Sequence, residues 1–370
     1  MLPEDLVGPE SQRRPLIEVD DPWQAIERLY ELGLTDGLPV VPPTDELVRS
    51  MLAGGVWAAE EILLHESSRN ISVSAHLAAV NAVMAGATPD YFPVIGAVLQ
   101  AMSEPRFRLH LPTTSTGGAA MLIAVNGPIR DQIGVHYREN LFGPGFRANA
   151  TIGRTVRLVL RNCLSAIPGV LDKSTQGNPG KYSLCFGEDE AASPWEPFHT
   201  TRGFDPSTST VTVFPAEAGH NIVNHGAADP EVLLRCFADT MAAGGSFSPG
   251  YSIIVFAPEH AHKIGAAGWD RTRVQEFLYE HACRSLADLK AMGKIEAAGS
   301  DPDWNSPNWR PSGNQTIGPG DDQRMIHRGW GPDDISLFVG GGSAGGHSAF
   351  FPSWSRARIV APVTKEIVLP

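Results

Sequence analysis

Cysteine is scarce in this chain of 370 residues, and long apolar runs are absent. The four cysteines, Cys163, Cys185, Cys236 and Cys283, form no Cys-x-x-Cys pair, so the sequence offers neither a zinc knuckle nor a thioredoxin-like motif. No apolar run reaches the roughly 18 residues of a membrane-spanning helix, and residues 1–21 lack the basic-then-apolar order of a signal peptide. We therefore expect a cytoplasmic protein with reduced thiols and no membrane partner.

Basic residues are also in short supply. Lysine and arginine total 29 against 41 acidic residues, for a net charge of −12. The electrostatic field of such an acidic chain repels nucleic acid. The sequence contains no dinucleotide fingerprint, Walker loop or flavin motif, so the cofactor is unknown, with a divalent metal as one option. What the chain does contain is 42% hydrophobic residues, enough to bury a large core.

Apolar runs and helical periodicities alternate along the chain and indicate an α/β fold. Asp21 followed by Pro22, and later Thr44, are typical of helix starts. Amphipathic patterns predict further helices over residues 229–242 and 271–292. Short apolar runs that are typical of buried strands cover residues 119–127, 209–214, 251–258 and 335–342.

An internal similarity predicts two related halves. Residues 71–81, 87–102 and 121–128 resemble residues 212–224, 228–243 and 252–259 in the order of their polar, helical and apolar segments. The alternative is a chance likeness between ordinary strand–helix–strand units. We expect an arm over residues 1–20, a first α/β half over 21–200 and a second over 201–370. The two halves are expected to pack intimately, with a ligand cleft between them.

Residues 141–199 hold the densest set of candidate functional side chains. The sequence GPGFRAN predicts a glycine-rich turn before a helix that Asn149 caps, and the free N–H groups of such a helix start bind anions. Arg147 and Arg154 are expected to hold a carboxylate or phosphate of the substrate. The alternative is a solvated helix face, to which we assign Arg157 and Arg161.

A second glycine-rich segment, GNPGKYSLCFGEDE at 177–190, supplies groups for proton transfer and nucleophilic attack. The cysteine within it needs a cationic neighbour to become a thiolate, and its apolar neighbours favour the alternative of a small buried hydrophobe. The predicted catalytic residues of this region are Lys181, Tyr182, Cys185, Glu188 and His199.

The run GGGSAGGHS at 340–348 directly follows a predicted strand. Glycine-rich backbone at the end of a strand lets a ligand approach closely and can donate N–H groups to developing negative charge. The run is neither a G-x-S-x-G elbow nor a Walker loop. We therefore predict a binding loop in which Ser343 and His347 contact the substrate.

Two further pairs of polar residues are candidates. Thr113 and Thr114 precede two glycines and are expected to line the same cleft, with a structural turn as the alternative. Glu217 and His220 are the candidate metal ligands. The ordinary alternative for such a histidine is a hydrogen-bonded polar residue.

Several segments together resemble a bacterial family found as gene neighbour of UGSC-type (seleno)proteins. They are LTDGLPVVPPT (34–44), NAVMAGATPDYFPV (81–94), FGPGFRANATIGR (142–154), GNPGKYSLCFGEDEAASPWEPFH (177–199), PEHAHKIGAAGW (258–269) and GGGSAGGHS (340–348). This sequence carries no UGSC or CGSC motif, so it is similar to the neighbour. The resemblance implies a UGSC-type protein partner whose chain supplies the redox or nucleophilic cysteine.

These residues favour an enzyme, a hydrolase or lyase, that acts on a small anionic or carbonyl-bearing molecule, alone or within a two-protein system. Arg147 would hold the anion, Lys181 or its neighbours would move protons, and the 340–346 backbone would stabilise negative charge. Two alternatives stay open: a non-catalytic subunit that docks a cysteine- or selenocysteine-bearing partner, and a small-molecule binding protein without chemistry. A homo- or hetero-oligomer is expected.

Overall fold

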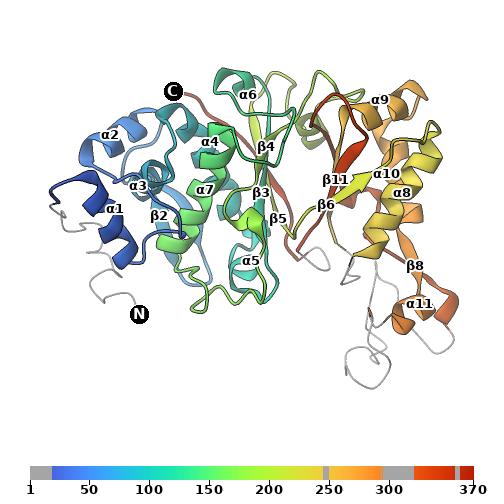
Figure 1. The fold of residues 1–370 in the computed structure, drawn as a ribbon, viewed down its shortest axis with the longest axis horizontal. Helices are drawn as coiled ribbons and strands as arrows, with labels where there is room; N and C mark the ends of the chain where they lie inside the picture. The colour runs from blue at the N-terminus through green and yellow to red at the C-terminus, as the bar shows by residue number, and fades with distance from the viewer. Residues whose placement is uncertain (1–18, 245–249, 293, 295–320, 355–358) are drawn as a thin grey trace.

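The computed structural model describes residues 19–244, 250–292, 294, 321–354 and 359–370 and has four layers. Two four-stranded mixed sheets lie face to face in the middle, and helices cover the outer face of each sheet (Figure 1). The chain therefore has the α/β fold that its sequence predicts.

The first sheet has the strand order β12-β5-β3-β4. β3 runs parallel to β4 and antiparallel to β5, which is antiparallel to β12. Its strands are β3 (Ala120–Asn126), β4 (Cys185–Gly187), β5 (Thr210–Ala216) and β12 (Val363–Glu366). Two of the four strands of this sheet thus come from beyond residue 200.

The second sheet repeats this arrangement in the order β10-β7-β11-β6. β7 runs parallel to β10 and antiparallel to β11, which is antiparallel to β6. Its strands are β6 (His220–Val223), β7 (Ser252–Phe256), β10 (Ile335–Val339) and β11 (His347–Pro352). In each sheet, one pair of neighbouring strands is parallel and the other two pairs are antiparallel.

The helices of the two halves follow the same order. α4, β3, α6, α7, β4 and β5 in the first half correspond to α8, β7, α9, α10, β10 and β11 in the second. α4 packs on β5 and β12, and α8 packs on β11 and β6. The helices are α4 (Phe92–Ser103), α6 (Ile129–Gln132), α7 (Arg147–Asn162), α8 (Pro230–Ala243), α9 (Pro258–Ala266) and α10 (Arg271–His281).

The internal similarity in the sequence therefore marks equivalent elements over most of its length. Residues 87–102 and 228–243 contain α4 and α8, and residues 121–128 and 252–259 contain β3 and β7. The first pair of similar segments does not correspond, because residues 71–81 contain β2 and α3, whereas residues 212–224 contain part of β5, from the first sheet, and β6, from the second. In the first half, β12 takes the place that β6 has in the second.

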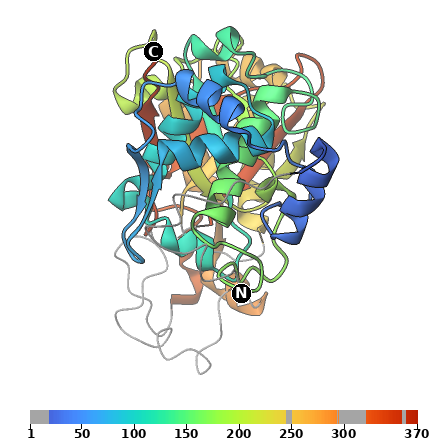
Figure 2. The same ribbon diagram turned by 90° about the vertical axis from the view of Figure 1, so that its left-hand side faces the viewer.

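The remaining elements lie outside the set that the two halves share. In the first half they add to the helical layer, which faces the viewer in Figure 2. They are α1 (Pro22–Glu31), α2 (Asp45–Ala53), β1 (Ile62–Glu66), β2 (Ile71–Ser74), α3 (Ala75–Ala85) and α5 (His110–Thr114). In the second half they are β8 (Cys283–Ser285), α11 (Leu286–Ala291) and β9 (Met325–His327).

Side-chain alternation along the strands divides the core into layers. On β3, Leu122 faces the opposite sheet, whereas Ile123 faces the helices of its own half. On β7, Ile253 faces the first sheet and Ile254 faces the helices of the second half. The core between the sheets is aromatic and includes Phe186, Phe198, Phe214 and Phe338. This shared core joins the two halves.

Most local predictions are confirmed, with one correction. The Asp21 side chain accepts hydrogen bonds at the start of α1, and Thr44 does so for α2. The single helix predicted over 271–292 is wrong: α10 ends at His281, and β8 pairs with β9 before Ser285 caps α11. Most of the predicted N-terminal arm lies outside the described residues. Among the described helices, none is long and apolar enough to cross a membrane.

Candidate active site around Lys181

Helix α7 positions one wall of the candidate site. Its apolar residues are buried against α3, α4 and the first sheet, so its arginines lie at the margins of the helix. Arg154 donates two hydrogen bonds of 2.8 Å to the carboxylate of Asp36, and Arg161 donates one of 3.1 Å to the carbonyl of Gly33. These two arginines hold the segment that follows α1. The prediction that Arg157 and Arg161 lie on a solvated face is wrong, since both side chains are largely covered.

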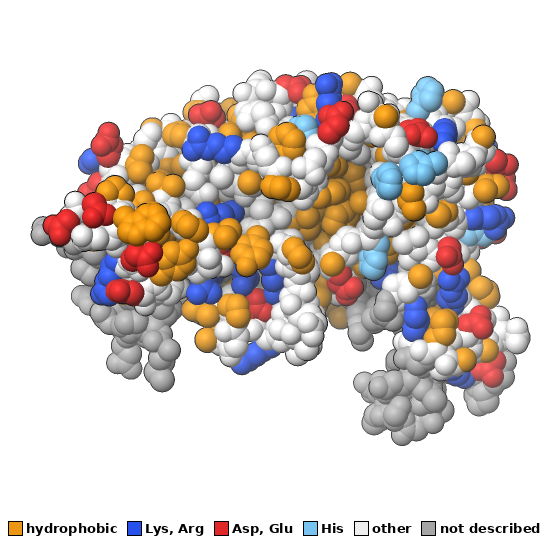
Figure 3. Space-filling view, in the orientation of Figure 1, with side chains coloured by type: hydrophobic (Ala, Val, Ile, Leu, Met, Phe, Trp, Pro, Cys, Tyr) orange, Lys and Arg blue, Asp and Glu red, His pale blue; other side chains and the backbone are white. Residues whose placement is uncertain are grey.

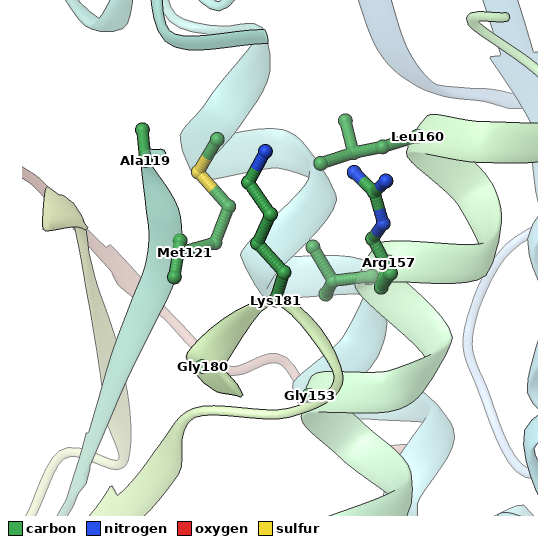
Figure 4. Close-up of a pocket in the computed structure, with 9 residues that line it drawn as sticks. Ala119, Met121, Gly153, Arg157, Leu160, Gly180 and Lys181 are labelled. Carbon is green, nitrogen blue, oxygen red and sulfur yellow. The ribbon is translucent and has the colours of Figure 1, made fainter. Parts of the chain in front are cut away.

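A small pocket opens between the start of β3, helix α7 and the loop before β4 (Figure 4). In the figure, the side chain of Lys181 lies between Met121 on one side and Leu160 and Arg157 on the other. The lining residues are Ala119, Ala120, Met121, Gly153, Val156, Arg157, Leu160, Gly180 and Lys181. Small residues leave the space, an apolar wall borders it, and two cationic side chains reach it.

The ammonium group of Lys181 is held in a fixed position at this pocket. Its Nζ donates to Asp172 Oδ2 at 2.7 Å and to Ser174 Oγ at 2.6 Å, and the side chain is only 15% exposed. Burial lowers the pKa of Lys181 below the usual lysine value, although the ion pair with Asp172 opposes this effect. The nearby charge of Arg157 lowers this pKa further.

Asp172 joins the two cations of the pocket. Arg157 Nη2 lies 3.2 Å from the same Oδ2 that accepts the Lys181 hydrogen bond. Burial alone would raise the pKa of Asp172, but the hydrogen bonds from Lys181 and Ser174 lower it to about 2. Asp172 is therefore ionised at neutral pH. The trio of Lys181, Arg157 and Asp172 has two positive charges against one negative charge when the lysine is protonated.

The loop that carries Asp172 and Lys181 is fixed to the loop before β3. The backbone N–H of Thr175 donates to the carbonyl of Thr116 at 2.9 Å, and the side chain of Asn178 donates to the carbonyl of Gly118. Thr113 and Thr114 lie earlier, in α5, where their hydroxyls donate to backbone carbonyls of the preceding turn. These two threonines are not among the residues that line the pocket.

The structure separates the other residues predicted beside Lys181. Tyr182 is 52% exposed and is not among the residues that line the pocket. Cys185 is buried in β4, and burial raises the pKa of its thiol to about 12. A thiol with this pKa carries no nucleophilic thiolate near neutral pH, so the structure favours the alternative of a small buried hydrophobe.

Glu188 belongs to a second, fully buried polar centre after β4. Its Oε2 accepts hydrogen bonds from Asn126 Nδ2 at 2.6 Å and from the Phe198 N–H at 2.8 Å. Burial raises the pKa of Glu188 to about 7, against the charge of Arg271 and these hydrogen bonds. His199 is also completely buried, and its Nε2 lies 3.1 Å from the carbonyl of Asp205. Neither side chain reaches the Lys181 pocket.

The start of α7 differs from its prediction. The helix begins at Arg147, and Phe146 is the N-cap. Asn149 lies inside the first turn, where its buried amide bonds to both the N–H and the carbonyl of His136. The guanidinium of Arg147 donates to the carbonyl of Gly86. Asn149 is therefore not the cap of this helix, and Arg147 connects α7 to the end of α3.

The glycine-rich run 340–348 lies in the second half, beside a hollow that Figure 3 shows between the two halves. Apolar side chains form the floor of this hollow. The exposed Phe142 packs against Phe351 with ring centroids 4.9 Å apart. Ser343 is exposed. His347 is exposed too, with Nδ1 3.2 Å from Asn221 Nδ2. These residues lie apart from the Lys181 pocket.

The two predicted metal ligands have separate surroundings. The ring of His220 stacks on Phe350 with centroids 6.0 Å apart. Glu217 is exposed, and its backbone N–H donates to the carbonyl of Pro352. Across the described residues, no group of three or more histidines, cysteines, aspartates or glutamates is placed to hold a metal ion.

Three residues of the candidate site, Asp172, Ser174 and Arg157, were missed at the level of sequence. Asp172 lies in the segment LDKSTQGNPGK, where it is an acid close to two lysines. That local charge pattern is the only signal for the ion pair. The partnership with Arg157 depends on how the loop after α7 folds back onto the helix.

Two comparisons with known proteins found no match to this chain. None of the protein-family models matches the chain, and no curated protein matches it either.

Proposed function

We propose that this protein is an enzyme, a lyase with hydrolysis as the alternative chemistry, that acts on a small carbonyl-bearing anion in the Lys181 pocket. The observation that carries the proposal is a lysine with a lowered pKa between an apolar wall and a second cation. Enzymes activate lysine amines by burial in an apolar pocket or by a cationic neighbour. Both conditions occur here.

The neighbours of Lys181 give each group a role. Asp172, ionised at neutral pH, accepts a hydrogen bond from the Lys181 ammonium group at 2.7 Å and holds the amine in place. The Ser174 hydroxyl holds the amine at 2.6 Å. Arg157 supplies positive charge for an anionic substrate. This set supports proton transfer or amine attack at a carbonyl group.

The proposal is tested by a turnover screen. Purified protein is incubated with short oxo, hydroxy and ester carboxylates, and products are followed by proton NMR. We expect turnover by the wild type and loss of more than roughly a hundredfold in rate for Lys181→Met. The matched control is Lys173→Met, because Lys173 lies on the same loop but is exposed and donates to the carbonyl of Gly169.

The alternatives give different results in the same experiment. Binding of a carboxylate without any product would indicate a small-molecule binding protein. Turnover that appears only after addition of a UGSC-type protein would indicate a subunit whose partner completes the site. Equal turnover by Lys181→Met and the wild type would contradict the proposal.

A further inference from the structure

Resting on the proposed function, we infer that Lys181 forms an imine with a small 2-oxo acid whose carboxylate binds Arg157. This assigns the substrate class of the pocket and a distinct role to each of its two cations. The inference depends on the placement of Lys181, Arg157 and Asp172 at the pocket.

The position of Lys181 suits attack on a carbonyl carbon. Its Nζ makes two hydrogen bonds, to Asp172 and Ser174, so one N–H position remains for the pocket. When the third proton, on the pocket side, is lost to water, the nitrogen gains a free electron pair at that place, while Asp172 and Ser174 still hold the other two N–H groups. The apolar wall of Met121 and Leu160 favours the neutral amine over the ammonium ion.

Arg157 provides the carboxylate site. Among the described residues it makes one hydrogen bond, from Nη2 to Asp172, which leaves guanidinium N–H groups for a ligand. Its side chain lines the pocket next to that of Lys181 (Figure 4). A 2-oxo acid has its carbonyl and carboxylate on adjacent carbon atoms, so it can engage both side chains at once.

Charge and size restrict the ligand further. Two cations and one anion leave one unit of positive charge on the trio, which a monocarboxylate neutralises. Ala119, Ala120, Gly153 and Gly180 leave only about 20 Å³ inside the pocket, which is less than the volume of a 2-oxo acid, so the ligand binds at the open side of the pocket with its carbonyl group toward Lys181. We therefore infer a short 2-oxo acid with one carboxylate.

The imine step balances without an oxidant or reductant. The neutral amine of Lys181 attacks the carbonyl carbon, a C–N bond forms, and the carbonyl oxygen becomes a hydroxyl group. A proton from solvent adds to this hydroxyl, the C–O bond breaks, and water leaves. The resulting protonated C=N group draws electrons from the neighbouring carbon, as a lyase reaction requires.

The test is reductive trapping with a matched pair of ligands. Wild-type protein is incubated with pyruvate or with its methyl ester in the presence of cyanoborohydride, and the modified lysine is located by peptide mass spectrometry. We expect an adduct on Lys181, formed roughly tenfold faster or more with pyruvate than with the ester, because a charge-assisted hydrogen bond has that effect. Lys181→Met should abolish it, and Lys173→Met should retain it.

Arg157→Gln should remove the preference for the acid over the ester while leaving trapping by the ester. Circular dichroism of this variant checks its fold, and the acid-to-ester ratio of the wild type decides the question if the variant does not fold. Equal trapping of acid and ester by the wild type, or an adduct spread over several surface lysines, would overturn the inference.

The same data separate this inference from the proposed function. Turnover that needs Lys181 but gives no adduct would leave the proposed enzyme intact, with Lys181 as a base, and would overturn the imine. An adduct on Lys181 without turnover of any compound would support the imine and contradict the proposed function.

Discussion

At the scale of single residues, Glu188 shows how burial changes a carboxyl group. It has no solvent exposure, and only Oε2 has hydrogen-bond partners among the described residues. The pKa of Glu188 rises from 4.5 to about 7 for this reason. Folding therefore favours the protonated form of this side chain.

We predict that Glu188→Gln changes the pH dependence of stability. Because the pKa of Glu188 is higher in the folded state, its stabilising contribution is complete below about pH 4.5 and is lost as pH rises through about 7. The variant has no such loss, so its free energy of unfolding relative to the wild type should increase by about 3 kcal/mol between pH 4 and pH 8. Urea denaturation at several pH values measures this difference.

Glu276→Gln is the control for this prediction, since Glu276 is an exposed residue on α10. A Glu188→Gln curve that stays parallel to the wild-type curve at every pH would show that Glu188 titrates normally in the folded protein.

The catalytic candidates also illustrate the residue scale. Lys181 lies in a pocket, whereas Cys185, four positions later, is buried in a strand. The sequence predicted both at one catalytic site, because they are close along the chain and both residue types can act as nucleophiles. Only the fold separates them, since exposure depends on which side of the chain faces the core.

At the scale of elements, helix α4 has a glycine in its interior, and helix propensity does not explain why a glycine occurs there. Gly96 lies in the middle of α4, and a Cβ atom there would be 2.1 Å from the ring of Trp57. The absence of a side chain lets the indole lie directly on the helix, where it also packs edge-on against Phe92.

We predict that Gly96→Ala destabilises the protein by about 2 kcal/mol, because the added methyl group overlaps the Trp57 ring and displaces it from the helix. This effect opposes the gain of about 1 kcal/mol that alanine normally brings to a helix interior. Chemical denaturation measures the difference. Gly226→Ala is the control, since a Cβ atom at Gly226 meets nothing within 4 Å. A variant at position 96 as stable as the wild type would mean that Trp57 moves without cost.

At the scale of the whole molecule, the two halves share one core. Phe338 on β10 contacts three rings of the first half, Phe186, Phe198 and Phe214, at centroid distances of 5.5, 4.2 and 6.0 Å. The sheet of the first half is completed by β12, which follows the whole second half in the sequence. Neither half is therefore a contiguous unit.

We predict that Phe338→Ala lowers the stability of both halves together, by about 4 kcal/mol, through loss of buried contacts and a residual cavity. Unfolding followed by tryptophan fluorescence and by circular dichroism should give one coincident transition. Val232→Ala, at an exposed position of α8, is the control and should change stability by less than about 0.5 kcal/mol. Two separate transitions, with only one shifted, would contradict the shared core.

The sequence by itself determined the local elements and much of their symmetry. Apolar runs predicted the main strands of both sheets, Asp21 and Thr44 marked helix starts, and the likeness of 87–102 to 228–243 identified equivalent helices. These features depend on short stretches of chain, where side-chain periodicity and capping groups act within a few residues.

Only the tertiary structure decided which polar residues meet. Asp172 pairs with Arg157 from α7, Arg154 binds Asp36 far along the chain, and Glu188 is enclosed between β3 and the loop after β4. Spacing along the sequence carries no information on such contacts, because they form when whole elements pack. The pKa values follow the same rule, since burial and neighbouring charges set them in the folded state.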